Sequence, residues 1–428
     1  MSSTAAAGLA WTTHDAAGPS WLLERRRLAA ETFARLEMPT ERDESFRYGR
    51  IDDLDLERFS STKSKGNADP VAASRLLAAI GPAAATIRTL DGEIASITFR
   101  DGVAPAGLSV SRISELSSSP VGFGDLLEAV GESLTFFAEA VTTDAAIVEI
   151  APGAAIAAPI VFVHEISEGA AACAVAPRTL CRLSRMAEAT VIEFFCSSPS
   201  AHLVVPVTEM FVAEGAHLRY HAVQQLGAAD WQLAYQLSRV ERDGELRSFS
   251  AALGGSYARL FTRSDLVGEG AESHLAATYF GKGDQVQDLR THQEHAVAKT
   301  SSDLVFKGAV RDQSRSVYSG MIHIAKGAKR SNAAQTNRNL VLSEGAHADS
   351  VPNLNIEEND VRCSHASAVG PIDAEQRFYL ESRGLPPAVA DRLILLGFFD
   401  DLFDAVPNAG CASYLREVFT AEIESVQP

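Results

Sequence analysis

Cysteine is scarce in this chain of 428 residues, which has only five, an odd number, at positions 173, 181, 196, 363 and 411. No two of them form a C-x-x-C pair. A secreted disulfide scaffold needs a paired set, so we expect free thiols in a reducing compartment. The N-terminus also lacks the cationic start of a secretory signal and carries His14 and Asp15 instead. These absences predict a cytoplasmic protein.

Long apolar runs are absent too, and acidic residues outnumber basic ones. The run from Ala154 to Val163 is far below the ~18 residues that span a bilayer, and Pro159 interrupts it. With 55 Asp and Glu against 38 Lys and Arg, the net charge of −17 disfavours nucleic acid and membranes as partners. Residues 282–338 reverse the balance, with ten basic and five acidic residues, but carry few aromatic side chains for stacking on bases. We interpret them as a solvated outer face.

Catalytic and nucleotide-binding motifs are missing as well. The chain has no G-x-x-x-x-G-K-[ST], no G-x-S-x-G and no H-E-x-x-H. His292 and His295 form an H-x-x-H in a segment of strand character, so we interpret them as exposed or ladder histidines rather than a metal pair. Three cysteines are interpreted as buried small hydrophobic residues, namely Cys173, Cys181 and Cys196. The motifs searched for therefore give little support for an enzyme.

The first 141 residues are predicted to form a helix-rich N-terminal domain. Ser20 is placed as the N-cap of a helix whose apolar period ends before Pro39. A polar loop is expected over residues 61–70, and a tight hairpin turn at Asp91-Gly92.

Residues 142–371 predict the fold class: mainly β, with a right-handed parallel β-helix (solenoid) core between N-terminal and C-terminal helical domains. Short alternating runs such as AIVEI and IVFVHE, separated by glycine-containing turns, favour stacked turns with aliphatic side chains inside. An antiparallel sandwich is the alternative, because the spacing of the turns is irregular.

Residues 372–428 are predicted to form a C-terminal domain of three helices. In the second helix, Leu393, Leu396 and Phe399 recur at helical spacing and form an apolar stripe. Such a stripe is either a core contact or, where little else covers it, a surface that docks a partner.

One short constellation carries candidate ligands, in the stretch Asp360-Val-Arg-Cys363-Ser-His365-Ala-Ser. Residues two apart in a strand share a face, so Cys363 and His365 point the same way. Thiolate and imidazole are ligands that iron and iron–sulfur clusters accept. Two ligands are too few for a closed site, so a second chain would have to complete it. The alternative is that the pair points into the core together with Val361 and Val369.

The stretch from 307 to 370, which contains SVYSGMIHIAKGAKRSNAAQTNRNLVLSEGAHADSVPNLNI and DVRCSHASAVG, closely resembles the SufB/SufD family of iron–sulfur cluster assembly proteins. The similarity continues through IDAEQRFYLESRGLPPAVADRLILLGFF at 372–399 and covers nearly the whole chain. The C-S-H run at Cys363–His365 is similar to SufD rather than SufB. The chain departs from the family at Asn355, usually acidic, and at Ala366, usually glycine.

The resemblance implies a non-catalytic scaffold subunit of a SufBCD complex. It implies pairing with a SufB-like protein through the β-helix and docking of a SufC-like ABC ATPase on the C-terminal helices, at Leu393, Leu396 and Phe399. His365 matches the SufD histidine at a nascent iron–sulfur cluster site shared with SufB, and Cys363 is its neighbour. Reduced flavin in the complex and a homodimer of the isolated chain are further expectations from the family. The alternatives are a SufB-like principal scaffold and a β-helix carbohydrate-active enzyme.

Overall fold

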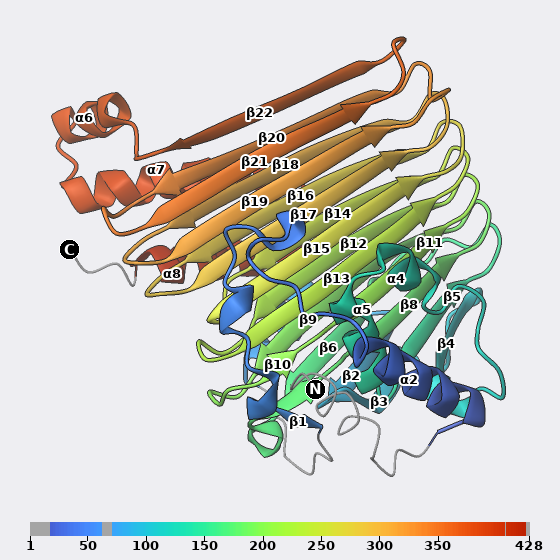
Figure 1. The fold of residues 1–428 in the computed structure, drawn as a ribbon. Coiled ribbons are helices and arrows are strands. Elements are labelled where there is room, and N and C mark those ends of the chain that lie inside the picture. Colours follow the sequence, from blue (N-terminus) through green and yellow to red (C-terminus); the bar gives the residue numbers. More distant parts are fainter. Residues whose placement is uncertain (1–17, 62–70, 407, 425–428) are drawn as a thin grey trace.

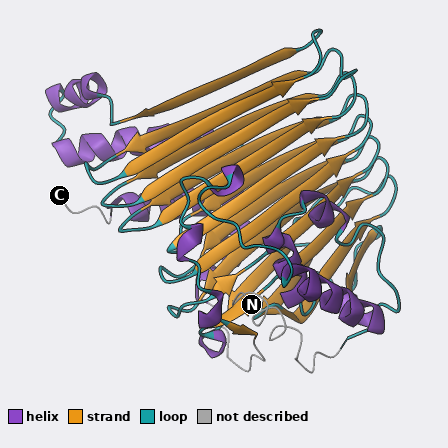
Figure 2. Cartoon of the chain, in the orientation of Figure 1, coloured by secondary structure: helices purple, strands orange, loops and turns teal. Residues whose placement is uncertain are grey.

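The computed structural model describes residues 18–61, 71–406 and 408–424. Strands alternate between two long sheets and pair in parallel with the strand one turn away, which builds a β-solenoid of about eight turns (Figure 1). The predicted solenoid is confirmed, and the antiparallel sandwich is wrong. The stack of strands forms the body of the molecule, and helices lie along its sides (Figure 2). The expected loop at 61–70 lies outside the described residues apart from Ser61, as does the segment before residue 18.

Each turn contributes one strand to each of two sheets. The main strands of the first, sheet A, are β5 (Ala146–Ile150), β8 (Arg178–Leu183), β11 (Val207–Val212), β13 (Trp231–Val240), β15 (Tyr257–Leu266), β17 (Val286–His295), β19 (Arg315–Ile324) and β21 (His347–Ile356). Those of sheet B are β6 (Ile160–Ile166), β9 (Glu188–Ser197), β12 (His217–Gln225), β14 (Glu245–Ala252), β16 (Glu272–Gly281), β18 (Ser301–Val310), β20 (Asn332–Val341) and β22 (Arg362–Gly370). Three short strands join the margin of sheet A: β1 (Ser60–Ser61), β7 (Cys173–Val175) and β10 (Leu203–Val204).

The beginning of the solenoid is extended by strands from the N-terminal region. β2 (Ala85–Leu90) pairs in parallel with β6 and forms an antiparallel hairpin with β3 (Glu93–Phe99), and β4 (Leu108–Arg112) pairs antiparallel with β5. Asp91 and Gly92 both have positive φ, 53° and 87°, as the predicted tight turn requires. The N-terminal region therefore adds strands to both sheets besides its helices.

The lumen of the solenoid is filled by buried side chains, both apolar and polar. Inward side chains of successive turns lie in register, roughly 4.8 Å apart. One such column runs from Leu275 through Leu304 to Gln335 and ends at His365. This column is apolar at Leu275 and Leu304 and polar in the last two turns, at Gln335 and His365. Elsewhere the middle turns also bury polar side chains, such as Gln236, which hydrogen-bonds to Ser248 and Ser250.

Helices of the N-terminal region cover the outer face of sheet A (Figure 1). They are α2 (Ser20–Phe33), α4 (Asp125–Val130) and α5 (Ser133–Val141), with 3-10 turns at Glu44–Phe46, Ile51–Asp53, Leu56–Arg58 and Ile113–Glu115 and a further one at Glu168–Ala170. α2 begins at Ser20, one residue earlier than predicted, because Pro19 rather than Ser20 is the N-cap. The fully buried Arg178 of β8 donates to Glu139 and Glu209, both at 2.8 Å, and so ties α5 to the sheet.

The C-terminal helices lie against the outer face of sheet B together with one N-terminal helix. α6 (Ala374–Ser382), α7 (Pro387–Asp404) and α8 (Ala409–Glu424) follow β22, and α3 (Val71–Ile80) packs beside α8. Apolar residues of α3, α7 and α8 share one cluster with outward residues of the sheet, including Val163, Phe194 and Phe249. Over the described ranges, no helix has both the length and the apolar character that crossing a membrane requires.

Candidate functional site

The last turn of the solenoid consists of β21 and β22, and both strands are sheet edges. Within the described part of the chain, β21 pairs only with β19, and β22 only with β20. No residue of either strand is fully buried. The two strands end the stack (Figure 1). Their outer edges have no pairing strand among the described residues, and their residues are exposed or only partly buried, so the end of the lumen between them is open.

Cys363 and His365 face the lumen of this open turn. They are in register with Ala333 and Gln335 of β20, whose side chains are buried inside the solenoid. Ser364 lies between them and points to the outer face, as strand alternation requires. The two side chains share a face, as predicted. Both side chains point inward, as core residues of the solenoid do, but among the described residues no further turn of the solenoid covers them.

Cys363 lies near the start of β22 and is half-buried. Its side chain packs with Val361 against an apolar cluster that contains Ile322, Ile324 and Ala333. Burial raises the pKa of the Cys363 thiol above its ordinary value. The thiol thus has part of the environment of a core cysteine, while it stays reachable from the open end.

His365 is exposed, and its ring makes no hydrogen bond or ion pair with the described residues. In the turn below, the hydroxyl of Tyr318 donates to Oε1 of Gln335 at 3.3 Å, whereas the buried Nε2 of Gln335 has no partner among the described residues. Across the lumen, Ser367 donates to Ser350 at 2.8 Å. The open end therefore presents an imidazole and a thiol. The buried amide nitrogen of Gln335, without a partner among the described residues, lies one turn below, and the sequence pattern alone did not indicate it.

In the folded chain, the thiol of Cys363 should react with a thiol reagent faster than the other four cysteines. The other four cysteines, Cys173, Cys181, Cys196 and Cys411, are buried, as predicted for the first three, and burial raises the pKa of Cys181 and Cys411 to about 12. Because the thiolate is the nucleophile and the pKa of Cys363 is raised, modification should be slower than that of a free thiol near pH 7 and should accelerate as the pH rises. A colorimetric disulfide reagent measures this rate. Cys363→Ser should abolish the fast phase, and a fast phase that survives in this variant would contradict the assignment.

The H-x-x-H histidines lie on opposite faces of β17 and cannot bind one metal together. His295 is fully buried, with Nδ1 at 2.7 Å from Thr300 Oγ1 and Nε2 at 2.9 Å from Ser302 Oγ, and burial lowers its pKa to about 4. His292 faces Glu294 at 3.1 Å on the outer side. The basic stretch around them is only partly solvated: Lys307 is buried and donates to Asp401 of α7 at 2.6 Å. The interpretation as a solvated face is wrong at this position.

The predicted apolar stripe on α7 is divided between core and surface. Phe399 is fully buried and contacts Phe403 and Phe419, with ring centroids 6.4 and 5.0 Å away. Leu396 is partly buried against the same cluster, and of the three stripe residues only Leu393 is exposed, over 44% of its surface. The core-contact alternative is therefore confirmed for Phe399 and in part for Leu396, because the outer face of sheet B, α3 and α8 cover them, and the expectation that little else covers the stripe holds only at Leu393.

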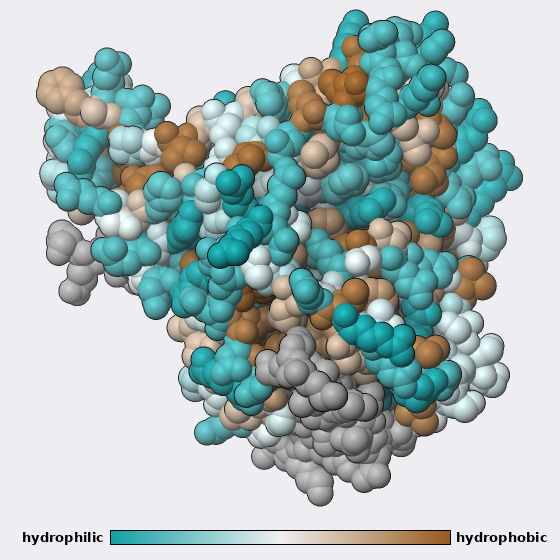
Figure 3. Space-filling view, viewed as in Figure 1, coloured by the Kyte–Doolittle hydropathy of each residue, from teal (hydrophilic) through white to brown (hydrophobic). Residues whose placement is uncertain are grey.

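The exposed apolar surface lies one helix earlier. α6 has no buried residue, and its adjacent Phe378 and Tyr379 are 70% and 57% exposed. An ion pair of 2.5 Å between Arg377 and Asp391 holds α6 beside α7. Apolar surface is visible at this protruding corner among hydrophilic residues (Figure 3). The predicted helix AEQRFYLES contained the signal, since its two adjacent aromatic residues are followed by no apolar partner at helical spacing.

Comparisons with known proteins agree with this architecture. The family described as "SUF system FeS cluster assembly, SufBD core domain" matches residues 165–398, more than half of the chain. The iron-sulfur cluster assembly protein SufD of Escherichia coli is 34% identical over 229 residues, which are 53% of this chain and 54% of that protein. SufD of Bacillus subtilis is 26% identical over 345 residues, 75% of this chain and 77% of that protein. A SufBD family protein of Mycobacterium tuberculosis is 37% identical over 211 residues, 46% of this chain and 52% of that protein.

The fold and these similarities define a class, the β-solenoid proteins of the SUF system for iron–sulfur cluster assembly. The chain belongs to the SufB/SufD family. The matched part spans about half the length of the relatives from E. coli and M. tuberculosis.

Proposed function

We propose that the protein is a SufD-like, non-catalytic scaffold subunit on which iron–sulfur clusters are assembled together with a SufB-like partner and a SufC-like ABC ATPase. The observation that carries this proposal is the uncovered last turn, with two unpaired strand edges and lumen-facing Cys363 and His365 between them. Family membership supports a role in the SUF system of iron–sulfur cluster assembly. The similarity to two SufD proteins supports a SufD-like rather than a SufB-like subunit.

The open end supports pairing with another solenoid. A long unpaired edge is a template for strand addition, and here both sheets end in one, of ten residues in β21 and nine in β22. A partner that continued both sheets would satisfy the edge groups and enclose the lumen. The same edges explain why an isolated chain is expected to pair with a second copy.

The nascent cluster is cargo in this scheme, and His365 is its proposed ligand from this chain. Neutral imidazole offers a nitrogen lone pair to iron, and the His365 ring has no competing partner among the described residues. Cys363, half-buried and with a raised pKa, is a weaker donor near pH 7. The remaining ligands would come from the partner's side of the interface.

The docking surface for the ATPase is proposed at the exposed corner of the C-terminal helices, defined by Phe378, Tyr379 and Leu393. Large, exposed apolar side chains on ordered helices are typical of docking sites. Of the predicted stripe, the proposed surface includes the exposed Leu393, whereas Leu396 is partly buried and Phe399 is buried in the apolar cluster under α7.

Replacing Phe378 and Tyr379 together by alanine should weaken binding of the ATPase by about 2 kcal/mol or more, because exposed aromatic anchors carry much of the energy of an interface. Titration calorimetry or co-purification with the SufC-like protein measures the loss. The melting temperature should change little, since neither side chain contributes to the core.

Leu23→Ala and Leu28→Ala on α2, which are 37% and 49% exposed, are matched control substitutions and should leave this binding unchanged. Unaltered affinity in the double aromatic variant would show that the ATPase docks elsewhere. Failure of the intact chain to co-purify with both partners would refute the proposed complex itself.

A further inference from the structure

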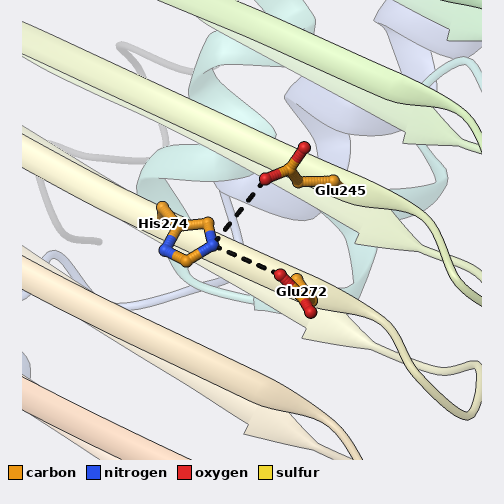
Figure 4. Close-up of side chains that lie close together, drawn as sticks. All are labelled: Glu245, Glu272 and His274. Atoms are coloured by element: carbon orange, nitrogen blue, oxygen red, sulfur yellow. Dashed lines mark hydrogen bonds and ion pairs between the residues drawn. The ribbon is translucent and has the colours of Figure 1, made fainter. Parts of the chain in front are cut away.

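A cluster of metal-binding side chains lies on the outer face of sheet B, away from the open lumen. Glu245 begins β14 and Glu272 begins β16, and the two are paired in register. His274 lies two residues further along β16 and therefore on the same face. Figure 4 shows the His274 ring between the two carboxylates, one from its own strand and one from the neighbouring strand.

The three donors are spaced as ligands of one ion. Nε2 of His274 lies 3.5 Å from Glu272 Oε2 and 3.8 Å from Glu245 Oε1, and all three donor atoms lie within 4.8 Å of one another. With bonds of about 2.0–2.1 Å to nitrogen and oxygen, the edge of a tetrahedral zinc site is roughly 3.3 Å. These two distances are long for hydrogen bonds but within about 0.5 Å of that edge.

Two neighbouring side chains act on Glu245 in opposite ways. His217, in register with it on β12, lies with Nδ1 at 2.9 Å from Oε2 and so orients the carboxylate. Arg247 donates through Nε to Oε1 at 2.6 Å, the oxygen that faces His274. A bound cation would have to displace this guanidinium, which is 54% exposed and free to turn into solvent.

We propose that Glu245, Glu272 and His274 bind one divalent transition-metal ion, with His217 positioning Glu245 and water completing the coordination. Imidazole combined with carboxylates suits Zn²⁺, Fe²⁺ or Mn²⁺ better than Ca²⁺ or Mg²⁺. Side-chain exposures of 17%, 49% and 34% leave an entry path from solvent. The rigid, paired strands fix the spacing of the donors in advance. The site is separate from the proposed function at the open end.

The experiment uses the full, tag-free chain after treatment with a chelator, titrated with Zn²⁺ by calorimetry and with Co²⁺ by visible absorption. We expect one ion per chain and a melting temperature that rises with the metal concentration. Glu272→Gln and His274→Ala should each lower the affinity for the metal at least ~10-fold. Loss of a residue that only orients a ligand already costs about 10-fold or more, so loss of a ligand itself should cost no less. Arg247→Gln should raise the affinity, because it frees the carboxylate oxygen.

His292→Ala is the matched control, since this partly exposed histidine also faces a glutamate on an outer face. It should leave the affinity unchanged. Equal affinity in the wild-type and His274→Ala chains, or loss of binding in the His292→Ala chain, overturns the assignment. The metal-free variants should melt at the temperature of the metal-free wild type, so a lost ion is distinguished from a lost fold.

Discussion

His365→Ala should leave a stable complex with the SufB-like and SufC-like partners that accumulates little or no iron–sulfur cluster. The side chain is exposed and makes no hydrogen bond with the described residues, so its removal should change the free energy of unfolding by no more than about 0.5 kcal/mol. Loss of a ligand should lower the occupancy of the cluster at least ~10-fold. Iron and acid-labile sulfide per intact complex, together with the melting temperature and ATPase rate, measure both effects.

Ser364→Ala is the matched control for this experiment, because Ser364 lies next to His365 on β22 but points to the opposite face. It should retain the wild-type cluster content. Cys363→Ser should have a milder effect than His365→Ala, since its thiol is half-buried. Normal iron and sulfide in the His365→Ala complex would refute the ligand role. A parallel fall in stability and cluster content would indicate a structural histidine instead.

Phe399→Ala should destabilise the protein by about 3–5 kcal/mol, the range for removing a fully buried aromatic side chain. The ring fills the space between α7, α8 and the outer face of sheet B, with Phe398, Phe403 and Phe419 around it. Its loss leaves a cavity that these rings can close only in part. Denaturant unfolding, followed by circular dichroism, measures the change.

Leu393→Ala is the comparison within the same helix, because 44% of Leu393 is exposed. It should change stability by about 0.5 kcal/mol or less and act on ATPase binding instead. If Phe399 were instead part of the docking surface, Phe399→Ala would leave the stability unchanged and weaken binding of the ATPase. A Phe399→Ala chain of wild-type stability would contradict the core assignment.

The class of fold and the candidate ligands are accessible from the sequence because both depend on local patterns. Alternation along each strand determines which side chains share a face, so the spacing of Cys363 and His365 is enough to place them on the same side of β22. The Asp91-Gly92 hairpin is likewise predictable, since its backbone conformation depends on the turn residues themselves. The resemblance to the SufB/SufD family rests on contiguous stretches of sequence and needs no tertiary information.

What the tertiary structure decided depends on contacts between residues distant in the chain. The burial of Phe399 follows from sheet B, α3 and α8 converging on α7, which no helical period reveals. The column that passes from Leu304 through Gln335 to His365 depends on the register of successive turns, and the exposure of His365 on where the stack ends. The cluster at Glu245 and His274 forms only because parallel pairing brings residues one turn apart within reach, a distance set by strand spacing and invisible to a local motif.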